Sequence, residues 1–334
     1  MRGGGNIIKR IVGILVCILL IFTILPKSAN IIVDRTYDST IFGNTLYVGG
    51  NGPNNYSKIQ NAIDNTSSGD TIFVFNGTYY ENIVIFTTIN LEGESKSATI
   101  IDGGSVGNVI TVFAQYVNIS NFTITNKEDV KISKGIRLEA DSNYCKIDNN
   151  IIKVSNIGIF IRSDFNTISN NQIIYNQYVG IHMSYCSSNT IQGNIISKNW
   201  IGIDTLSVDS CIIKDNNISS NNLSIKFVES MKNTVIDNTI SHNYMGFLVF
   251  ESIFNTIKKN NFICNYEYHA YFETSYNRWT QNYWDDYLGF GFKPIKGEMY
   301  HYEWLGWGED PIEISIPWIQ FDWHPAREPY DIPT

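Results

Sequence analysis

Residues 189–199 read NTIQGNIISKN, residues 211–221 read CIIKDNNISSN and residues 233–243 read NTVIDNTISHN. The same pattern recurs from residue 145 to residue 282, with each copy beginning about 22 residues after the last. Its copies begin at Cys145, Asn166, Asn189, Cys211, Asn233, Asn255 and Asn277. Five residues into each copy stands an asparagine: Asn150, Asn171, Asn194, Asn216, Asn238, Asn260 and Asn282.

Further columns keep phase with these asparagines. A third asparagine column consists of Asn176, Asn199, Asn221, Asn243 and Asn265. Apolar residues fill the third place of every copy, as Ile147, Ile168, Ile191, Ile213, Val235, Ile257 and Trp279. They also fill the eighth place, as Ile152, Ile173, Ile196, Ile218, Ile240, Phe262 and Trp284. Short β-branched runs at this period predict a solenoid of strands, because helical repeats need longer amphipathic stretches.

The columns have a structural explanation in a parallel β-helix. Coils that stack about 4.8 Å apart place equivalent residues in ladders along the axis. Stacked isoleucines then fill the interior, and an inward asparagine at a bend can pass a hydrogen bond to the asparagine of the next coil. Asparagine also tolerates the left-handed backbone that such bends need. The asparagine columns therefore indicate scaffold and say little about chemistry.

Composition narrows the classes of partner. The chain has 334 residues with 32 acidic and 24 basic side chains, a net charge of −8 and a pI near 5.2. An acidic chain of this kind does not favour a nucleic-acid partner. Only 17% of the residues are charged, so the surface is mainly neutral and polar. Such a surface suits hydroxyl-rich ligands such as glycans.

The chain divides into four segments. Residues 1–30 place Arg2, Lys9 and Arg10 before an uncharged run over residues 11–25, which predicts a signal peptide or an uncleaved N-terminal membrane anchor. The run is shorter than the ~20 residues of a full span, and both alternatives imply export. Residues 31–44 form a linker, residues 45–284 the β-helix of about ten coils, and residues 285–334 an aromatic cap.

Both ends of the solenoid carry expected caps. Over residues 56–64, Ser57 and Gln60 form a capping-box pattern that predicts a short helix over the N-terminal end. Six of the seven tryptophans fall between Trp279 and Trp323, which predicts a C-terminal cap that closes the coil or folds back along it. We expect this tail to cover outward apolar positions of the late coils, namely Leu206, Val228, Leu248, Phe250 and Phe272.

One outward strip is the candidate binding surface. Strand alternation directs two columns of side chains outward: Arg137, Phe160, His182, Asp204 and Lys226, and beside them Glu139, Arg162 and Ser184. Carboxylates and cations at this spacing can bind hydroxyl groups or act as acid and base. The strip residues Arg137, Glu139, Arg162, His182, Asp204 and Lys226 are the predicted substrate-binding residues. The alternative is a solvated face with weak ion pairs between coils.

The sequence predicts no resident cofactor, although three groups bear on metals. Glu229, Glu251 and Glu273 would stack either at an exposed bend, which we favour, or around calcium. His182, Met183 and Cys186 offer ligands for copper, but alternation directs His182 and Met183 to opposite faces. The tail offers a metal or acid–base group in Asp285, Asp286, His301, Asp322 and His324.

The cysteines that remain after export are expected to be buried free thiols. These are Cys145, Cys186, Cys211 and Cys264. Cys145 and Cys211 share one column but stand three coils apart, about 14 Å at β-spacing, which is too far for a disulfide.

Several motifs resemble a known family. They are LYV (46–48), IQNAI (59–63), GDTI (69–72), GTYYEN (77–82) and TIIDGG (99–104). Together with the Asn-Thr-Ile repeats they resemble the NosD-type right-handed parallel β-helix proteins and their carbohydrate-binding and sugar-hydrolase (CASH) module, in the pectate-lyase-like superfamily. The tail IPWIQFDWHP (316–325) is similar to the ends of exported archaeal members.

The resemblance implies the fold and leaves the function open. Some relatives are named for periplasmic copper handling, some β-helices cleave polysaccharides as lyases or hydrolases or epimerise them, and many surface members have no known activity. The chain lacks the Asn-Thr-Asp, Gly-His-Gly and Arg-Ile-Lys motifs of the galacturonases and the Tyr-Gly-X-Asp-Pro-His motif of the alginate epimerases. We therefore expect an exported surface protein that binds glycan or cell-envelope polysaccharide without catalysis, with polysaccharide cleavage and copper handling as alternatives.

Overall fold

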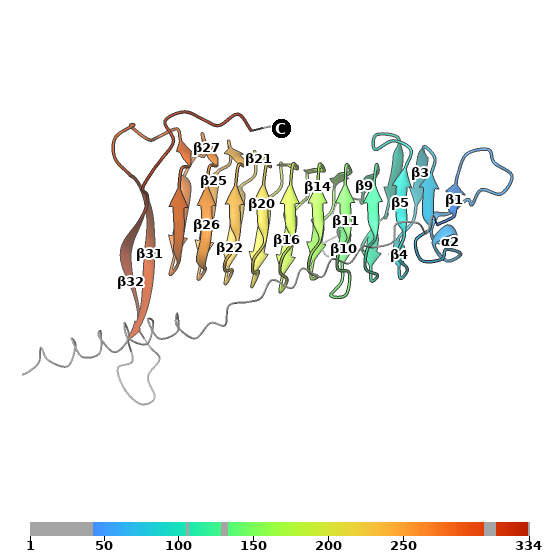
Figure 1. Cartoon of the computed structure of the whole chain (residues 1–334), viewed down its shortest axis with the longest axis horizontal. Helices are drawn as coiled ribbons and strands as arrows, with labels where there is room; N and C mark the ends of the chain where they lie inside the picture. Colours follow the sequence, from blue (N-terminus) through green and yellow to red (C-terminus); the bar gives the residue numbers. More distant parts are fainter. Residues whose placement is uncertain (1–42, 105–106, 128–132, 304–311, 333–334) are drawn as a thin grey trace, which may run out of the picture. The chain divides into compact units, whose positions relative to one another are not determined.

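The computed structural model describes residues 43–104, 107–127, 133–303 and 312–332 (Figure 1). The predicted targeting segment 1–30 and all but residues 43–44 of the linker lie outside these residues. Within them, no helix has both the length and the apolar character that a membrane span requires. The described chain forms an all-β parallel solenoid of about 11 turns, which confirms the predicted fold and slightly exceeds the ten coils expected.

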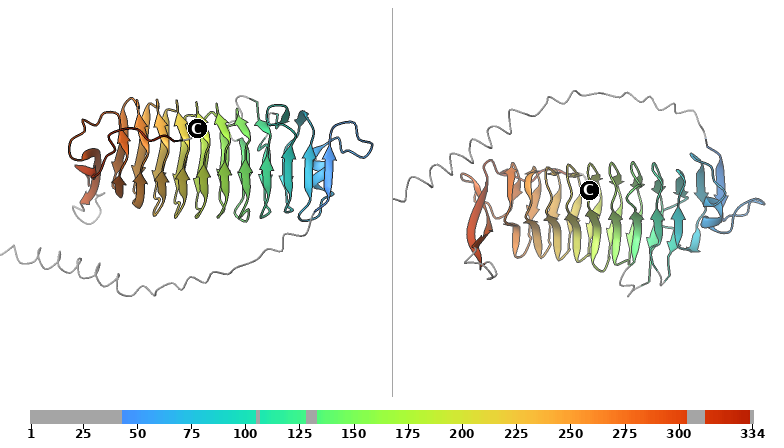
Figure 2. Two further views of the ribbon diagram at one scale, coloured as in Figure 1. Left: turned by 45° about the horizontal axis from the view of Figure 1, so that its top comes forward. Right: turned by 90° about the horizontal axis from the view of Figure 1, so that it is seen from below.

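The solenoid has three faces, and each complete turn contributes one strand to each of them. Within a face, strands of successive turns pair in parallel, so the turns stack as a row of coils (Figure 2). Face 1 consists of β1 (Thr45–Val48), β2 (Thr71–Val74), β5 (Asn90–Gly93), β8 (Asn118–Ser120), β11 (Lys146–Asp148), β14 (Thr167–Ser169), β17 (Thr190–Gln192), β20 (Ile212–Lys214), β23 (Thr234–Ile236), β26 (Ile253–Lys258), β29 (Tyr276–Thr280) and β32 (Ile312–Asp322). Face 2 consists of β3 (Gly77–Tyr80), β6 (Thr99–Asp102), β9 (Thr123–Thr125), β12 (Ile151–Lys153), β15 (Gln172–Ile174), β18 (Ile195–Ser197), β21 (Asn217–Ser219), β24 (Thr239–Ser241), β27 (Asn261–Ile263) and β30 (Tyr283–Trp284). Face 3 consists of β4 (Ile83–Ile85), β7 (Ile110–Val112), β10 (Lys134–Leu138), β13 (Ile157–Ile161), β16 (Val179–Ser184), β19 (Ile201–Leu206), β22 (Leu223–Val228), β25 (Met245–Phe250), β28 (Tyr268–Glu273) and β31 (Lys293–Glu303).

The predicted apolar columns form the core. Every residue of the two columns that begin at Ile147 and Ile152 is buried, down to Trp279 and Trp284 at the C-terminal end. Each turn thus adds one layer of side chains to a continuous interior. Since a coil alone could not bury these side chains, stacking is what stabilises the fold.

The asparagine columns form the expected hydrogen-bond ladders. In the second ladder (Asn150 to Asn282), both the backbone N–H and the side-chain Nδ2 of Asn194 donate to Oδ1 of Asn216, at 2.9 and 3.0 Å. The same Nδ2 also donates to the backbone oxygen of Ile168 in the preceding turn, at 2.9 Å. The first ladder (Cys145 to Asn277) and the third ladder (Asn176 to Asn265) repeat this arrangement.

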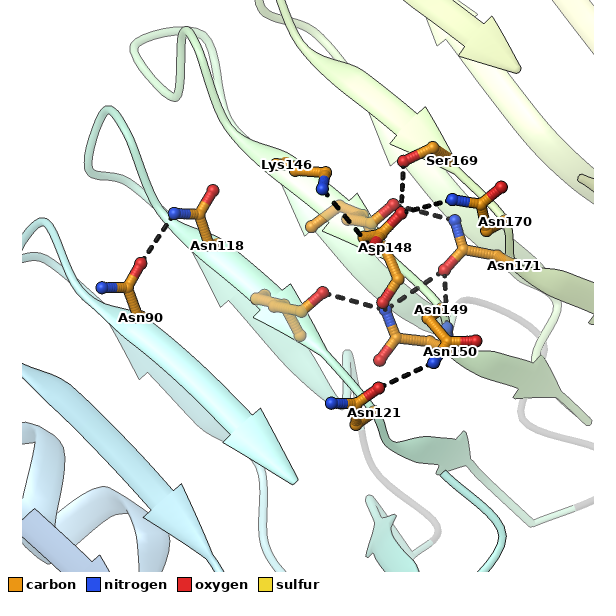
Figure 3. A network of polar contacts seen from close by, with 12 residues as sticks. Asn90, Asn118, Asn121, Lys146, Asp148, Asn149, Asn150, Ser169, Asn170 and Asn171 are labelled. Atoms are coloured by element: carbon orange, nitrogen blue, oxygen red, sulfur yellow. Dashed lines mark hydrogen bonds and ion pairs between the residues drawn. The ribbon is translucent and has the colours of Figure 1, made fainter. Parts of the chain in front are cut away.

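Figure 3 shows the start of the second ladder, where Asn150 donates to Asn171. Beside it, on the outer surface, the carboxylate of Asp148 accepts hydrogen bonds from Ser169 and Asn170. Burial would raise the pKa of Asp148, but these hydrogen bonds and the charge of Lys146 outweigh it and hold that pKa below its ordinary value.

The residues with left-handed backbone immediately precede the asparagines of the second ladder, and the asparagines themselves do not have this conformation. The residue before each ladder asparagine has a positive φ: Asn149, Asn170, Gly193, Asp215, Asp237, Lys259 and Gln281. The expectation that the ladder asparagines themselves adopt this conformation is therefore wrong. Their positions are fixed by the hydrogen bonds they make, which explains why the bend residues vary in type while the asparagines do not.

The N-terminal end carries the predicted helix with a different cap. Helix α2 (Ile59–Ile63) begins after Lys58, and no side-chain capping bond of the Ser57 and Gln60 type forms. Instead the carboxylate of Glu81 accepts hydrogen bonds from the N–H groups of Ile59 and Gln60. The Gln60 side chain bonds both backbone groups of Val84 on β4. It therefore substitutes for a neighbouring strand at the edge of Face 3.

The C-terminal end is closed by an antiparallel hairpin of β31 and β32. Gln320 on β32 accepts hydrogen bonds from Asn277 and Trp279, the last polar and apolar members of their columns. Asp322 accepts from both nitrogens of Asn282 and from the indole of Trp284. The two side chains thus take the places that asparagines of a further coil would occupy.

The tail after β32 follows Face 2. Tyr330 exchanges two hydrogen bonds with the side chain of Asn261 on β27, and Ala326 pairs with Tyr283 on β30. In Figure 1 this segment runs back beside β27. The described contacts of this segment are on Face 2. We had expected the tail to cover the outward apolar side chains of Face 3.

Those apolar side chains divide into two groups. Leu206, Val228, Leu248 and Phe250 face outward and are half-buried. Phe272 is fully buried in the core, so its predicted outward position is wrong. The reason is a one-residue shift, because Met245 pairs with Tyr268 and every later residue of β28 moves one place along its strand.

Three of the four described cysteines are buried free thiols, as expected. Burial raises the pKa of Cys145 and of Cys211 to about 11 and that of Cys186 to about 12. Cys211 holds a ladder position, where its sulfur accepts the N–H of Asn189 at 3.2 Å. Cys264 is exposed, which corrects the expectation for that residue.

Candidate functional site

The predicted strip lies on the outer surface of Face 3. Strand pairing places Arg137, Phe160, His182, Asp204 and Lys226 in register on five consecutive turns. Glu139 and Arg162 form the neighbouring column, because each follows a residue of the pair Leu138 and Ile161. Alternation within the strands therefore placed all six predicted side chains on one face, and the register brings them together.

A chain of contacts links the first four turns of the strip. The Nε atom of Arg137 lies 2.6 Å from a carboxylate oxygen of Glu139, and its Nη2 donates a hydrogen bond to the other oxygen. The guanidinium lies over the ring of Phe160, 5.4 Å from its centroid. That ring stacks on the imidazole of His182 with centroids 5.3 Å apart. His182 then pairs with Asp204, with 2.9 Å between Nδ1 and Oδ2.

The His182–Asp204 pair is partly shielded from water. The side chains retain 18% and 13% of their accessible surface. A cluster of apolar residues stands at the start of the strands that carry the strip: Ile157, Val179, Ile201 and Leu223. A carboxylate at Nδ1 orients an imidazole and leaves Nε2 for a ligand, so the pair can bind a hydroxyl group or transfer a proton.

Two groups of apolar side chains flank the strip along Face 3, and we call them the apolar shoulders. Phe86 and Phe113 stack 4.8 Å apart on the turns before Glu139, in its column. Leu206, Val228 and Phe250 follow Ser184 in the same column. The outer surface of Face 3 is therefore polar in its middle turns and apolar at both ends.

The glutamate column predicted as a bend or a calcium site is shorter than expected. Glu229 and Glu251 occupy equivalent exposed bends with φ of 49° and 46°. Glu273 pairs with Phe250 and leaves the column, because the one-residue shift of β28 puts Thr274 at the bend. Two carboxylates at exposed bends match the interpretation we favoured from sequence.

The proposed copper group of His182, Met183 and Cys186 does not assemble. Met183 and Cys186 are buried in the core, whereas His182 lies on the outer surface. Strand alternation had indicated this separation.

A second polar cluster surrounds His269 on β28 and joins it to two of the predicted tail residues, although His269 itself was missed from sequence. Nε2 of His269 lies 2.7 Å from Oδ1 of Asp285 and 3.7 Å from Oδ1 of Asp286. Its Nδ1 lies 3.1 Å from the amide nitrogen of Asn265. Lys293 on β31 lies 2.5 Å from the other oxygen of Asp286. His269, Asp286 and Lys293 border one pocket of about 470 Å³ at the C-terminal end.

A column of small residues that ends in a histidine was the sequence signal for this cluster. Equivalent places on successive turns hold Gly135, Gly158, Gly180, Gly202, Ser224, Gly246 and His269. A side chain at Gly202 would place Cβ 2.5 Å from the backbone oxygen of Ser224 in the next turn. Residue 269 has room for an imidazole because β31 pairs with β28 only at Phe272 and Glu273. The start of β28 therefore has no paired strand on the next turn.

The polar residues predicted in the tail separate in the structure. Asp285 and Asp286 join His269, while Asp322 is buried at the ladder ends and His324 is exposed. The side chain of His301 lies outside the described part of the chain. Burial would raise the pKa of Asp285, but the N–H of Cys264 and the charge of His269 hold it below its ordinary value.

Comparison with known proteins identifies the fold and a family. No curated protein matches the sequence. The structure is similar to tailspike protein 2 from Escherichia coli O157:H7 bacteriophage CAB120, with a TM-score of 0.52, 14% identity and coverage of 73% of this chain but only 38% of the tailspike. It is also similar to pectate lyase Pel9A, with a TM-score of 0.51, 16% identity and coverage of 73% of this chain and 80% of that one. At these identities the similarity shows the fold alone.

A family model supplies the closer relationship. The model described as "Periplasmic copper-binding protein (NosD)" matches residues 63–289, more than half of the chain. The match spans most of the solenoid, including the strip on Face 3 and the residues His269, Asp285 and Asp286, and it agrees with the resemblance to NosD-type proteins. The chain belongs to the NosD family of parallel β-helix proteins.

Proposed function

We propose that this is an exported protein that binds polysaccharide along the strip of Face 3. The observation that carries the proposal is the line of contacts from Arg137 through Phe160 and His182 to Asp204. It offers alternating cationic, aromatic and anionic groups at a spacing of about 4.8 Å per turn. An extended polymer with hydroxyl groups could follow such a line, and the apolar shoulders could contact the C–H faces of its rings.

The family and the fold neighbours support this assignment. The family name refers to a periplasmic protein, and the pectate lyase among the fold neighbours acts on a polysaccharide by its name. Residues 1–30 have the composition of a targeting segment. A lyase or hydrolase would use His182 and Asp204 as its acid–base pair, so release of unsaturated or reducing sugar ends separates catalysis from binding.

Removing two cations of the strip tests the proposal. We expect Arg162→Ala combined with Lys226→Ala to weaken binding to acidic glycans on an array by about tenfold or more, because each cation would pair with a ligand carboxylate. The fold should be unaffected, since neither side chain contributes to the core.

The matched control is Lys232→Ala, which removes an exposed cation at a bend outside the strip. Equal binding of the control and the double variant would show that the strip does not bind glycan. Loss in both variants would indicate a general charge effect, also against the proposal.

Metal binding is the second candidate function, and the His269 cluster favours it. One imidazole nitrogen and two carboxylate oxygens lie within 4.8 Å of one another. This donor set fits a divalent transition metal such as copper(II), the metal in the family name. His269, Asp285 and Asp286 would hold the ion, although the ion pair of Lys293 with Asp286 competes with it.

A copper(II) titration checks this second candidate. If the cluster binds the ion, His269→Gln should weaken binding by about tenfold or more, whereas His242→Gln, which changes an exposed histidine on another turn, should have no effect. Isothermal titration of both variants gives the two affinities. Equal affinities would exclude the cluster as the copper site.

A further inference from the structure

A pocket on the outer surface of Face 1 is not part of either candidate site. It has a volume of about 530 Å³, within the range of small-molecule sites. Three elements form it: β26, β29 and the end of β32 with the residues that follow. The lining includes Phe254, Tyr276, Asn277, Arg278, Gln320 and Trp323.

Its walls are aromatic rings that the fold leaves in water. Phe254 is 65% exposed, Tyr276 is 67% exposed and Trp323 is 60% exposed. Exposed aromatic rings on earlier turns cover one another, as in the stack of Tyr116, Tyr144 and Phe165 with centroids 5.0 Å apart. By contrast, within the described residues Phe254 and Tyr276 contact no other ring.

The ring of Trp323, one wall of the pocket, is held in place by other rings of the protein. The ring of Trp323 lies 5.2 Å from Phe321 and 5.3 Å from Phe292, measured between centroids. The backbone before Trp323 is fixed as well, because Asp322 is bonded to the end of the second ladder. A rigid wall lowers the entropic cost of binding.

Arg278 supplies the only charge among the lining residues. It lies on β29 in register with Thr256 on β26 and follows Thr234 in the same column. Its side chain is exposed, and the described residues show no hydrogen bond or ion pair for it. The amides of Asn277 and Gln320 at the pocket floor are already engaged in the ladder end. Arg278 is therefore the group available to fix a ligand by charge.

We propose that this pocket binds a sugar residue that carries a carboxylate, such as a uronic acid of an acidic polysaccharide. Aromatic walls suit the C–H face of a pyranose ring, since tyrosine and tryptophan combine an apolar body with a polar edge. The guanidinium of Arg278 pairs with the carboxylate in a bidentate arrangement. The inference goes beyond the proposed function, because the pocket is on Face 1 and includes no residue of the strip.

Tryptophan fluorescence during titration with tetragalacturonic acid tests the inference, with neutral maltotetraose as the comparison sugar. We expect the acidic sugar to change the emission of Trp323 and to bind at least about tenfold more tightly than the neutral one. Trp323→Ala should remove the signal and weaken binding by about tenfold measured calorimetrically. Arg278→Gln should remove the preference for the acidic sugar.

Trp318→Ala is the matched control, because Trp318 is on β32, the strand that ends just before Trp323, is 50% exposed and does not line the pocket. Three results would overturn the inference: no fluorescence change with either sugar, equal losses in the Trp318 and Trp323 variants, or an unchanged sugar preference in Arg278→Gln. A change of sedimentation coefficient in Trp323→Ala without sugar would instead assign the pocket to a second copy of the chain.

The strip variants keep this test separate from the proposed function. Arg162→Ala with Lys226→Ala should leave the Trp323 signal intact, since the strip contains no tryptophan. A weakened array signal with an intact Trp323 response supports both sites. An intact array signal with a lost response in Trp323→Ala supports the pocket alone.

Discussion

Asp322→Ala should lower the free energy of unfolding by about 4 kcal/mol, because several buried donors lose one shared acceptor. The carboxylate is fully buried and accepts hydrogen bonds from Gln281, Asn282 and Trp284. Without it these N–H groups remain buried and unpaired at the C-terminal end of the second ladder. Urea unfolding followed by circular dichroism measures the loss.

Asp322→Asn is the conservative control. An asparagine oxygen at this place accepts from both nitrogens of Asn282, as on every earlier turn of the ladder. We expect it to cost about 2 kcal/mol, because the amide nitrogen that replaces Oδ1 cannot accept the hydrogen bond from the N–H of Gln281. Equal stability of the alanine variant and the wild type would show that the hairpin does not terminate the ladder.

Asn238→Leu should lower the free energy of unfolding by about 3 kcal/mol, with the fault in the middle of the solenoid. The Asn238 oxygen accepts from both nitrogens of Asn216, and its Nδ2 donates to Ile213 and Asn260. Leucine has a similar size but no polar atom, so these partners stay buried without hydrogen bonds. The same unfolding experiment measures the effect, and hydrogen exchange at Asn216 locates it.

The control for this second variant is Asn217→Ala. Asn217 stands one residue after a ladder asparagine, is half-buried and makes no side-chain bond within the ladder. A surface asparagine of this kind should change stability by no more than about 0.5 kcal/mol. If both variants cost the same, the ladder would contribute no more than an ordinary surface amide.

The repeated part of this fold is predictable because one period sets several properties together. Counting from Cys145 locates the ladders and the buried apolar columns, and strand alternation places the six strip residues on Face 3. These predictions needed only the spacing of residues within a coil and its repetition.

Assigning residues to columns from the repeat period fails where the period changes without an insertion that the sequence reveals. One extra residue precedes β28, and a compensating irregularity between Ile253 and Thr256 restores the phase by Asn277. Both flanking asparagines keep their spacing, so Phe272 and Glu273 were assigned to the wrong columns. The tail was also beyond prediction, because Asp322 meets Asn282 across 40 residues of sequence and no repeat relates them.

Parallel stacking also gives the solenoid a built-in unit of length. Each coil adds about 4.8 Å along the axis and brings its own strand to each face. Duplicating the coil of residues 230–251 would therefore move the predicted strip residues of Face 3 and the aromatic pocket on Face 1 apart by one such step without duplicating a residue of either. The distance between the two proposed binding surfaces can in this way change during evolution by whole coils.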